Sequence, residues 1–126
     1  APVQLAVANR VVYSAHDFSA SVSRQAWFDA ADYPQNLPST WDSLWGYLAR
    51  DDIAPVYLSA FGTRLDSEED RQWLSALVDY VHDRDLSFAF WCLNPNSGDT
   101  GGLLLDDWQT VDEEKLEALA PLLASP

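Results

Sequence analysis

The chain has 126 residues, of which 48% are apolar, and a formal net charge of −13 from 20 acidic and 7 basic side chains. This length and apolar content suffice for one domain with a hydrophobic core and are not typical of disorder. The surplus of acid argues against nucleic acid and anionic membrane surfaces as partners, because both are bound mainly through Lys and Arg. Cys92 is the single cysteine, so no disulfide can form within the chain.

The first part of the chain is expected to form a strand, a loop and a helix. Residues 11–15 (VVYSA) predict the strand, and His16 follows at its carboxyl end. A loop interrupted by prolines is expected over residues 19–39. Residues 41–50 then predict a helix, because apolar side chains recur at the spacing of one helical face. Those side chains are Trp41, Leu44, Trp45 and Leu48.

The middle of the chain repeats this order. Residues 53–59 predict a buried strand, because the segment is short, apolar and β-rich. Residues 60–62 (Ala-Phe-Gly) are expected to leave the strand in a tight turn, at the end where α/β folds place their chemistry. Ser67 and Asp70 have the spacing of a capping box, which predicts a helix from there to about His82. The core-facing residues of that helix are Trp73, Leu74, Leu77, Val78 and Val81.

A third strand and helix complete the pattern. Residues 87–91 (SFAFW) predict the strand, and a loop over residues 92–111 follows, long enough to indicate a functional role. Asp112 is expected to cap the last helix, with one apolar stripe formed by Leu116, Leu119 and Leu123. Three strand–helix units in succession predict an α/β fold, with a parallel sheet and helices outside it.

Three strands make an incomplete sheet, since both edges and the inner face would be open to water. We therefore expect the chain to be a piece of a larger (βα) barrel. Missing strands, a second copy or a partner would close it.

Three segments are specific enough to indicate a family. They are VVYSAHDF at 11–18, IAPVYLSAFGT at 53–63 and FAFWCLNPNSGDTGGLLLDDWQTVD at 88–112. In this order and spacing they resemble the last three βα units of bacterial glycoside hydrolase family 5 endoglucanases. The resemblance implies the C-terminal part of a TIM (β/α)8 barrel. Residues 1–126 would be one segment with its sixth, seventh and eighth units, and the first five strands, with the general acid, would lie outside this chain. It implies no cofactor and no metal.

By this resemblance the reaction is retaining hydrolysis of β-1,4-glucan, which uses two carboxyl groups roughly 5–5.5 Å apart. The family's nucleophilic glutamate falls at Ala60, and the tyrosine that hydrogen-bonds it falls at Phe18. A methyl group cannot form a glycosyl-enzyme intermediate, so we expect hydrolysis to be disabled, and enzyme activity is left open. The expected substrate-binding positions are His16, Phe18 and Trp91, with Trp91 as the platform under the sugar.

The implied ligand is a β-glucan or cello-oligosaccharide, and the implied location is extracellular. A complementary N-terminal barrel half or a second copy of the chain is the expected protein partner. Two other functions stay open. The chain could be a repurposed or engineered barrel fragment, in which a cleared pocket beside His16 serves non-glycosidic chemistry with the imidazole as base. It could also be a pure binding module, in which Trp91 binds saccharide without turnover.

The long loop carries further candidates. Asp99 is interpreted as a turn residue beside glycines. The alternative is a calcium site shared with Asp106 and Asp107, whose spacing is not that of an EF-hand. Trp108 is expected to pack the loop onto the rest of the domain. Cys92 is interpreted as a small buried hydrophobic residue rather than as a nucleophile.

Overall fold

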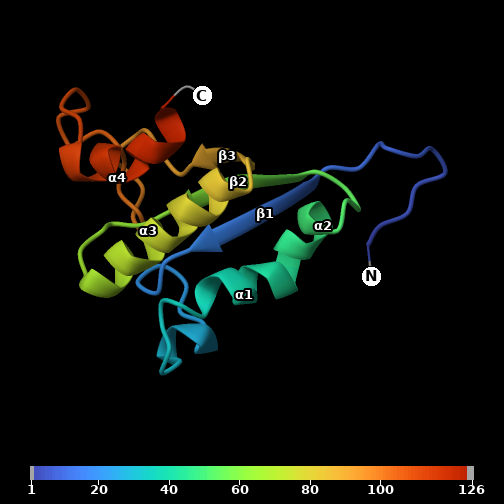
Figure 1. Cartoon of the computed structure of the whole chain (residues 1–126). Helices are drawn as coiled ribbons and strands as arrows, with labels where there is room; N and C mark the ends of the chain where they lie inside the picture. Colours follow the sequence, from blue (N-terminus) through green and yellow to red (C-terminus); the bar gives the residue numbers. More distant parts are fainter. Residues whose placement is uncertain (1, 125–126) are drawn as a thin grey trace.

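The computed structural model describes residues 2–124. Three parallel strands form one sheet with β2 in the middle (Figure 1). The strands are β1 (Tyr13–Phe18), β2 (Val56–Gly62) and β3 (Ser87–Phe90). Helical segments connect each strand to the next, which confirms the predicted α/β class and the parallel sheet. The arrangement is that of a fragment of a TIM barrel, in which each strand is followed by an outer helix.

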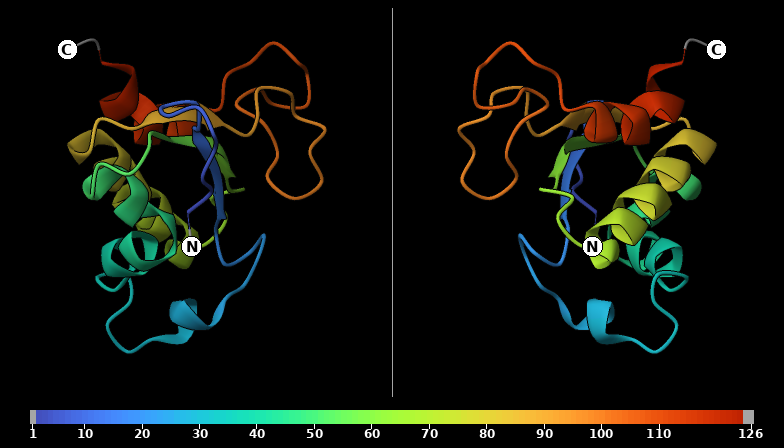
Figure 2. Two further views of the ribbon diagram at one scale, coloured as in Figure 1. Left: turned by 90° about the vertical axis from the view of Figure 1, so that its right-hand side faces the viewer. Right: turned by 90° about the vertical axis from the view of Figure 1, so that its left-hand side faces the viewer.

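Helices gather on one side of the sheet, and the loop over residues 92–111 extends on the other side (Figure 2). A 3-10 helix η1 (Ala26–Asp29) and a continuous helical stretch follow β1. That stretch consists of α1 (Leu37–Trp41), the π-helical η2 (Asp42–Gly46) and α2 (Tyr47–Arg50), while α3 (Glu68–Asp83) follows β2 and α4 (Glu113–Leu123) follows β3. No helix within residues 2–124 is long and apolar enough to cross a membrane.

The core lies between the sheet and these helices. Phe61 of β2 is completely buried and makes edge-on contacts with Phe88 and Phe90 of β3. Trp41 of α1 and Trp73 of α3 close the core from the helical side, and both are completely buried. These large rings therefore serve packing, which leaves few aromatic residues for binding a ligand.

The two helix starts predicted from side-chain caps are confirmed. The hydroxyl of Ser67 accepts a hydrogen bond of 3.1 Å from the backbone N–H of Asp70 at the start of α3. The carboxylate of Asp112 accepts one of 3.1 Å from the backbone N–H of Lys115 at the start of α4. Each cap satisfies an N–H group that has no partner inside its helix.

β1 and β2 extend further toward their carboxyl ends than predicted, whereas β3 ends at Phe90, one residue before the predicted end at Trp91. The first strand spans Tyr13–Phe18 rather than residues 11–15, so His16 lies within it. Residues 60–62 belong to β2 and do not form a turn. Residues 16–18 of β1 pair with residues 60–62 of β2, and this pairing extends both strands. Hydrogen bonding between the strands outweighs the local preference of Gly62 for a turn.

The first helical stretch begins at Leu37, inside the predicted loop, rather than at residue 41, and one of its side chains faces the wrong way. Pro38 does not interrupt it but lies in the first turn of α1, where a missing N–H costs nothing. Leu44, predicted to face the core, is 51% exposed. The π-helical turn η2 widens the spacing between side chains that share a face, so a stripe counted at regular α-helical spacing fails there.

The apolar stripe predicted for α4 is wrong in two of its three positions. Leu119 is buried as predicted, but Leu116 and Leu123 are exposed. Lys115, one turn before Leu119, faces the core instead. The stripe is displaced because the ammonium group of Lys115 finds hydrogen-bond acceptors inside the domain.

Candidate functional site

Four predicted site positions lie on the face of the sheet that the helices leave open. On β1, Ala15 and Asp17 are buried toward the helices. His16 and Phe18 alternate with them and therefore point to the opposite face. His16 is exposed and Phe18 is half-buried.

Ala60 joins this face through an irregularity in β2. Ala15 pairs with Leu58, but the next residue, His16, pairs with Ala60, so the intervening Ser59 is an extra residue, a β-bulge. In regular pairing Ser59 would take the place opposite His16, and Ala60 would turn toward the helices. The bulge thus keeps Ala60 opposite His16 and turns Phe61 into the core.

Trp91 follows β3 and completes the group. Phe88 and Phe90 pack against the core, so alternation directs Trp91 to the open face. Its indole is 52% exposed. Its backbone N–H donates a 2.8 Å hydrogen bond to the carbonyl oxygen of Phe61, which ties the end of β3 to β2. The open face thus brings together His16, Phe18, Ala60 and Trp91 at the carboxyl ends of three neighbouring strands.

Asp17 lies between His16 and Phe18 but faces the helical layer behind the site. Its carboxylate accepts a 2.8 Å hydrogen bond from the indole N–H of Trp73 in α3. Burial raises the pKa of Asp17 to about 6, and the hydrogen bond from Trp73 opposes this shift. Asp17 therefore fixes β1 to the helical layer and takes no place on the open face.

A buried polar network holds the carboxyl ends of β1 and β2 together. Asp70 is completely buried and accepts hydrogen bonds from the hydroxyls of Ser21 (2.5 Å) and Thr63 (2.8 Å). Thr63 in turn accepts one of 3.0 Å from the hydroxyl of Ser19. The sequence alone predicts only that Asp70 lies at a helix start, and this role of its side chain was not predicted. Alternation along the strands carries no signal for it, because Ser19 and Ser21 lie 44 and 49 residues from their partners Thr63 and Asp70.

The long loop is organised by its own polar groups. The carboxylate of Asp107 accepts hydrogen bonds from the backbone N–H groups of Gln109 (2.9 Å) and Thr110 (2.8 Å) and from the hydroxyl of Thr110 (2.5 Å). These bonds lower the pKa of Asp107. Trp108 at this turn is 54% exposed, so the prediction that it packs the loop down is wrong. The hydrogen bonds of Asp107 thus fix the turn over residues 107–110, and the exposed indole of Trp108 does not hold it.

Two further loop predictions concern metal binding and the thiol. Within residues 2–124, no group of three or more His, Cys, Asp or Glu side chains is arranged to hold a metal ion. Asp99 is exposed. Cys92 is a buried free thiol, as predicted. Its Sγ lies 3.4 Å from the carbonyl oxygen of Asn94 and 3.7 Å from that of Gly101, so it belongs to the packing of the loop.

Three parallel strands joined by helices on one side of the sheet define a fragment of a (β/α) barrel. Comparison with known proteins specifies the family. Residues 1–97 match the family described as cellulase (glycosyl hydrolase family 5). The chain therefore belongs to glycosyl hydrolase family 5.

Individual relatives agree with this assignment. An endoglucanase from Paenibacillus polymyxa is 50% identical over 97% of this chain and 31% of its own length. The catalytic domain of the major endoglucanase from Xanthomonas campestris is 33% identical and superposes with a TM-score of 0.85, over 94% of this chain and 35% of that one.

Two structures of an endocellulase from Pyrococcus horikoshii hold cellotetraose, one with a Glu-to-Ala and one with a Tyr-to-Phe substitution. Each is 36% identical with a TM-score of 0.81, over 90% of this chain and 31% of that one. The chain thus spans about a third of the length of these relatives.

Proposed function

We propose that the chain is the C-terminal segment, units six to eight, of an endoglucanase-like barrel that binds β-glucan without hydrolysing it. The observation that carries this proposal is the pairing of His16 with Ala60 on the open face, at the carboxyl ends of β1 and β2. In a retaining glycosidase this place needs a carboxylate that attacks the sugar. Here it holds a methyl group.

Binding is supported by what remains on the open face. The indole of Trp91 is half exposed, so its flat ring is free to stack on the apolar face of a pyranose. His16 of β1 is exposed on the same face, and its imidazole ring can form hydrogen bonds with a ligand. A face with one exposed aromatic ring and few polar groups suits a neutral sugar, and the net charge of −13 disfavours an anionic one.

The absence of hydrolysis follows from two positions. Ala60 has no atom that can form the glycosyl-enzyme bond, and Phe18 has no hydroxyl with which to orient a nucleophile. Loss of such groups is compatible with binding, because the Pyrococcus horikoshii endocellulase holds cellotetraose with a Glu-to-Ala and with a Tyr-to-Phe substitution.

The rest of the barrel is proposed to come from a complementary N-terminal half or from a second copy. β1 and β3 are both edges of the sheet, and hydrogen-bonding groups of such edges favour pairing with a further strand. The open face carries exposed apolar side chains, including Tyr57 and Trp91. An extracellular location is also proposed, since one relative is the major extracellular endoglucanase of Xanthomonas campestris.

Titration calorimetry with cellotetraose tests the binding proposal, using the protein in the assembly in which it purifies. Trp91→Ala is expected to weaken affinity by about tenfold or more, since stacking on one aromatic ring contributes on the order of 1–3 kcal/mol. Trp108→Ala is the matched control, because that indole is equally exposed but lies at the tip of the loop. Equal losses in the two variants would contradict the proposed platform.

A second assay addresses turnover. Release of reducing ends from a soluble β-glucan is expected to stay at the background level for the unmodified protein. Steady hydrolysis that Ala60→Gly leaves unchanged would show that another carboxylate acts as nucleophile, and would end the proposal of a disabled site.

One observation favours a different chemistry. The ring of His16 is exposed and stands opposite the small side chain of Ala60. We propose as the second candidate that His16 acts as a base on a non-glycosidic substrate in this cleared space. Loss of p-nitrophenyl acetate hydrolysis in His16→Ala, but not in the exposed-histidine control His82→Ala, would support it. Equal rates in all three proteins would remove it.

A further inference from the structure

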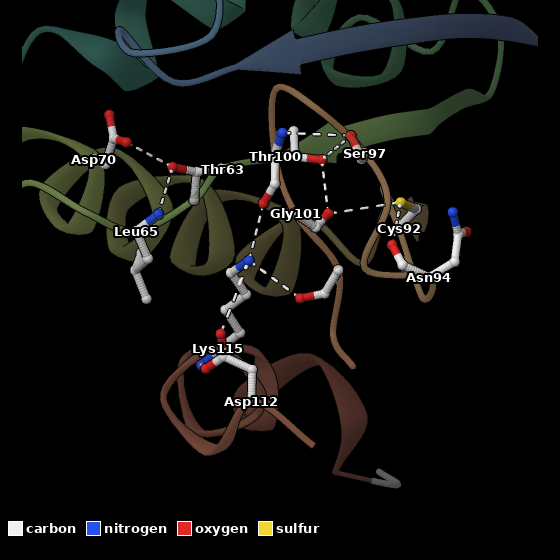
Figure 3. Close-up of polar contacts among 11 residues, drawn as sticks. Thr63, Leu65, Asp70, Cys92, Asn94, Ser97, Thr100, Gly101, Asp112 and Lys115 are labelled. Carbon is white, nitrogen blue, oxygen red and sulfur yellow. Dashed lines mark hydrogen bonds and ion pairs between the residues drawn. The ribbon is translucent and has the colours of Figure 1, made fainter. Parts of the chain in front are cut away.

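Lys115 is a cation in an unusual place. It lies on the core-facing side of α4 and is 4% exposed. Its Nζ donates hydrogen bonds to the backbone oxygens of Thr100 (2.9 Å) and Gly102 (3.1 Å), both in the long loop (Figure 3). The carboxylate of Asp112 is more distant, at 3.9 Å. Backbone carbonyl groups therefore provide the closest contacts of the ammonium group. Burial lowers the pKa of Lys115, and the charge of Asp112 opposes this shift.

The loop is shaped to receive this ammonium group. Thr100 and Gly102 are buried, and buried carbonyl groups without a donor would be destabilising. Between them, Gly101 has φ +62°, and a Cβ atom there would lie 3.3 Å from the Nζ of Lys115. The Thr-Gly-Gly segment thus turns its carbonyl oxygens toward α4 and leaves room for the lysine.

The segment held by Lys115 lies against the chain that follows Trp91. The N–H of Leu103 donates to the carbonyl oxygen of Cys92 at 2.8 Å, and that of Leu104 donates to Leu93 at 3.0 Å. The approach is close, since a Cβ atom on Gly102 would lie 2.4 Å from the oxygen of Asn94. Residues 92–94 therefore rest directly on residues 102–104.

The same segment reaches the central strand. A Cβ atom on Gly62 of β2 would lie 2.0 Å from the carbonyl oxygen of Trp91 and 3.3 Å from the Cγ2 of Thr100. Gly62, Trp91 and Thr100 thus meet at one point at the edge of the open face. A displacement of the Thr100–Gly102 segment would move the backbone of Trp91.

We propose that Lys115 is a positioning residue for saccharide binding. Its hydrogen bonds to the carbonyl oxygens of Thr100 and Gly102 fix the loop segment that supports Trp91, and so set the orientation of the indole. This inference rests on the proposed function, because it takes Trp91 as the platform. Lys115 lies behind the loop and touches no sugar, so it acts only through these carbonyl groups.

Hydrogen exchange of backbone amides, measured by NMR, tests the structural half of the inference without any ligand. Lys115→Met keeps the length of the side chain and removes its donors, while Lys115→Gln keeps an N–H donor and removes the charge. Leu119→Ala is the control, since it opens a cavity beside the same helix but removes none of the hydrogen bonds between Lys115 and the loop. Rates are compared after correction for the global stability of each variant.

We expect Lys115→Met to accelerate exchange at Leu103 and Leu104 about tenfold more than Leu119→Ala does, as loss of one net hydrogen bond predicts. Lys115→Gln should fall between them. Equal acceleration in Met and control variants, or a Gln variant no better protected than Met, would overturn the inference. If Lys115→Met does not fold, Lys115→Gln provides the test. A larger increase in exchange rate at Leu103 and Leu104 than in α3 would support the inference, and an equal increase in both regions would overturn it.

Cellotetraose titration of the same variants tests the functional half. Lys115→Met is expected to bind about tenfold more weakly than Leu119→Ala. Unchanged affinity in Lys115→Met would overturn the link to Trp91. If the unmodified protein binds no cellotetraose, the proposed function fails, while the exchange measurement still decides whether Lys115 fixes the loop.

Discussion

The carboxylate of Asp17 and the indole N–H of Trp73 meet at 2.8 Å across the interface between β1 and α3. Asp17 lies between His16 and Phe18, which point to the opposite face of the sheet. The hydrogen bond of Asp17 to Trp73 therefore fixes residues 16–18 to the helical layer, while His16 and Phe18 face the open side of the sheet.

Asp17 should make stability depend on pH. Burial raises its pKa from 3.8 to about 6, so the folded protein binds this proton more tightly than the unfolded chain does. The stabilisation is fully present below pH 3.8 and is lost as pH rises through about 6. The loss amounts to about 3 kcal/mol. Urea unfolding at pH 4 and pH 7 should show Asp17→Asn gaining stability relative to the unmodified protein as pH rises, and a constant difference would contradict this.

Ala60→Glu combined with Phe18→Tyr should create hydrolysis in a completed barrel. The new carboxylate would stand opposite His16, at the position that we propose for the nucleophile of a retaining glycosidase. We expect release of reducing ends from soluble β-glucan to rise by at least about a hundredfold. Ala60→Gln with Phe18→Tyr is the control, because the amide has the same size but cannot attack. Activity in the Gln variant as high as in the Glu variant would rule out a nucleophilic role for this position.

Gly62→Ala should destabilise the fold. The added Cβ would lie 2.0 Å from the carbonyl oxygen of Trp91, so the end of β3 would have to move. We expect a loss of about 2 kcal/mol or more in the free energy of unfolding, together with weaker cellotetraose binding. Gly98→Ala is a matched control, since nothing lies within 4 Å of its added Cβ. Similar midpoints of urea unfolding for the two variants would show that this close approach is not maintained.

Asp70→Ala should be costly because the side chain is completely buried. Its removal leaves the hydroxyls of Ser21 and Thr63 without their acceptor. A loss of about 3 kcal/mol or more is expected in chemical unfolding. Asp79→Ala, an exposed aspartate on the same helix, should change stability by no more than about 0.5 kcal/mol. A small loss in Asp70→Ala would mean that the network contributes little to joining the two strand ends.

Local sequence patterns were sufficient for the order of elements. Ser67 and Asp112 predicted the starts of α3 and α4, because a capping side chain bonds an N–H only three residues away. The alternation of strands and helices predicted the parallel sheet, because a strand joined to the next by a helix returns in the same direction. The family, too, was indicated by short segments at fixed spacing, and the comparisons confirm it.

Tertiary contacts decided what local patterns could not. Leu44 is exposed because it lies in a π-helical turn. Lys115 is buried because its ammonium group donates hydrogen bonds to carbonyl groups of the long loop. The network of Asp70 likewise joins segments far apart in the chain.

The amino-acid sequence by itself determined which side chains are available: Ala60 and Phe18, at the positions proposed for the family's glutamate and tyrosine, and Trp91 after the third strand. Only the tertiary structure decided that these residues and His16 share one face. Side chains along a strand alternate between the two faces of the sheet. One extra residue in a bulge therefore moves every later side chain to the opposite face. Ser59 is that residue, and its bulge forms because β2 must match both the pairing with β1 and the burial of Phe61.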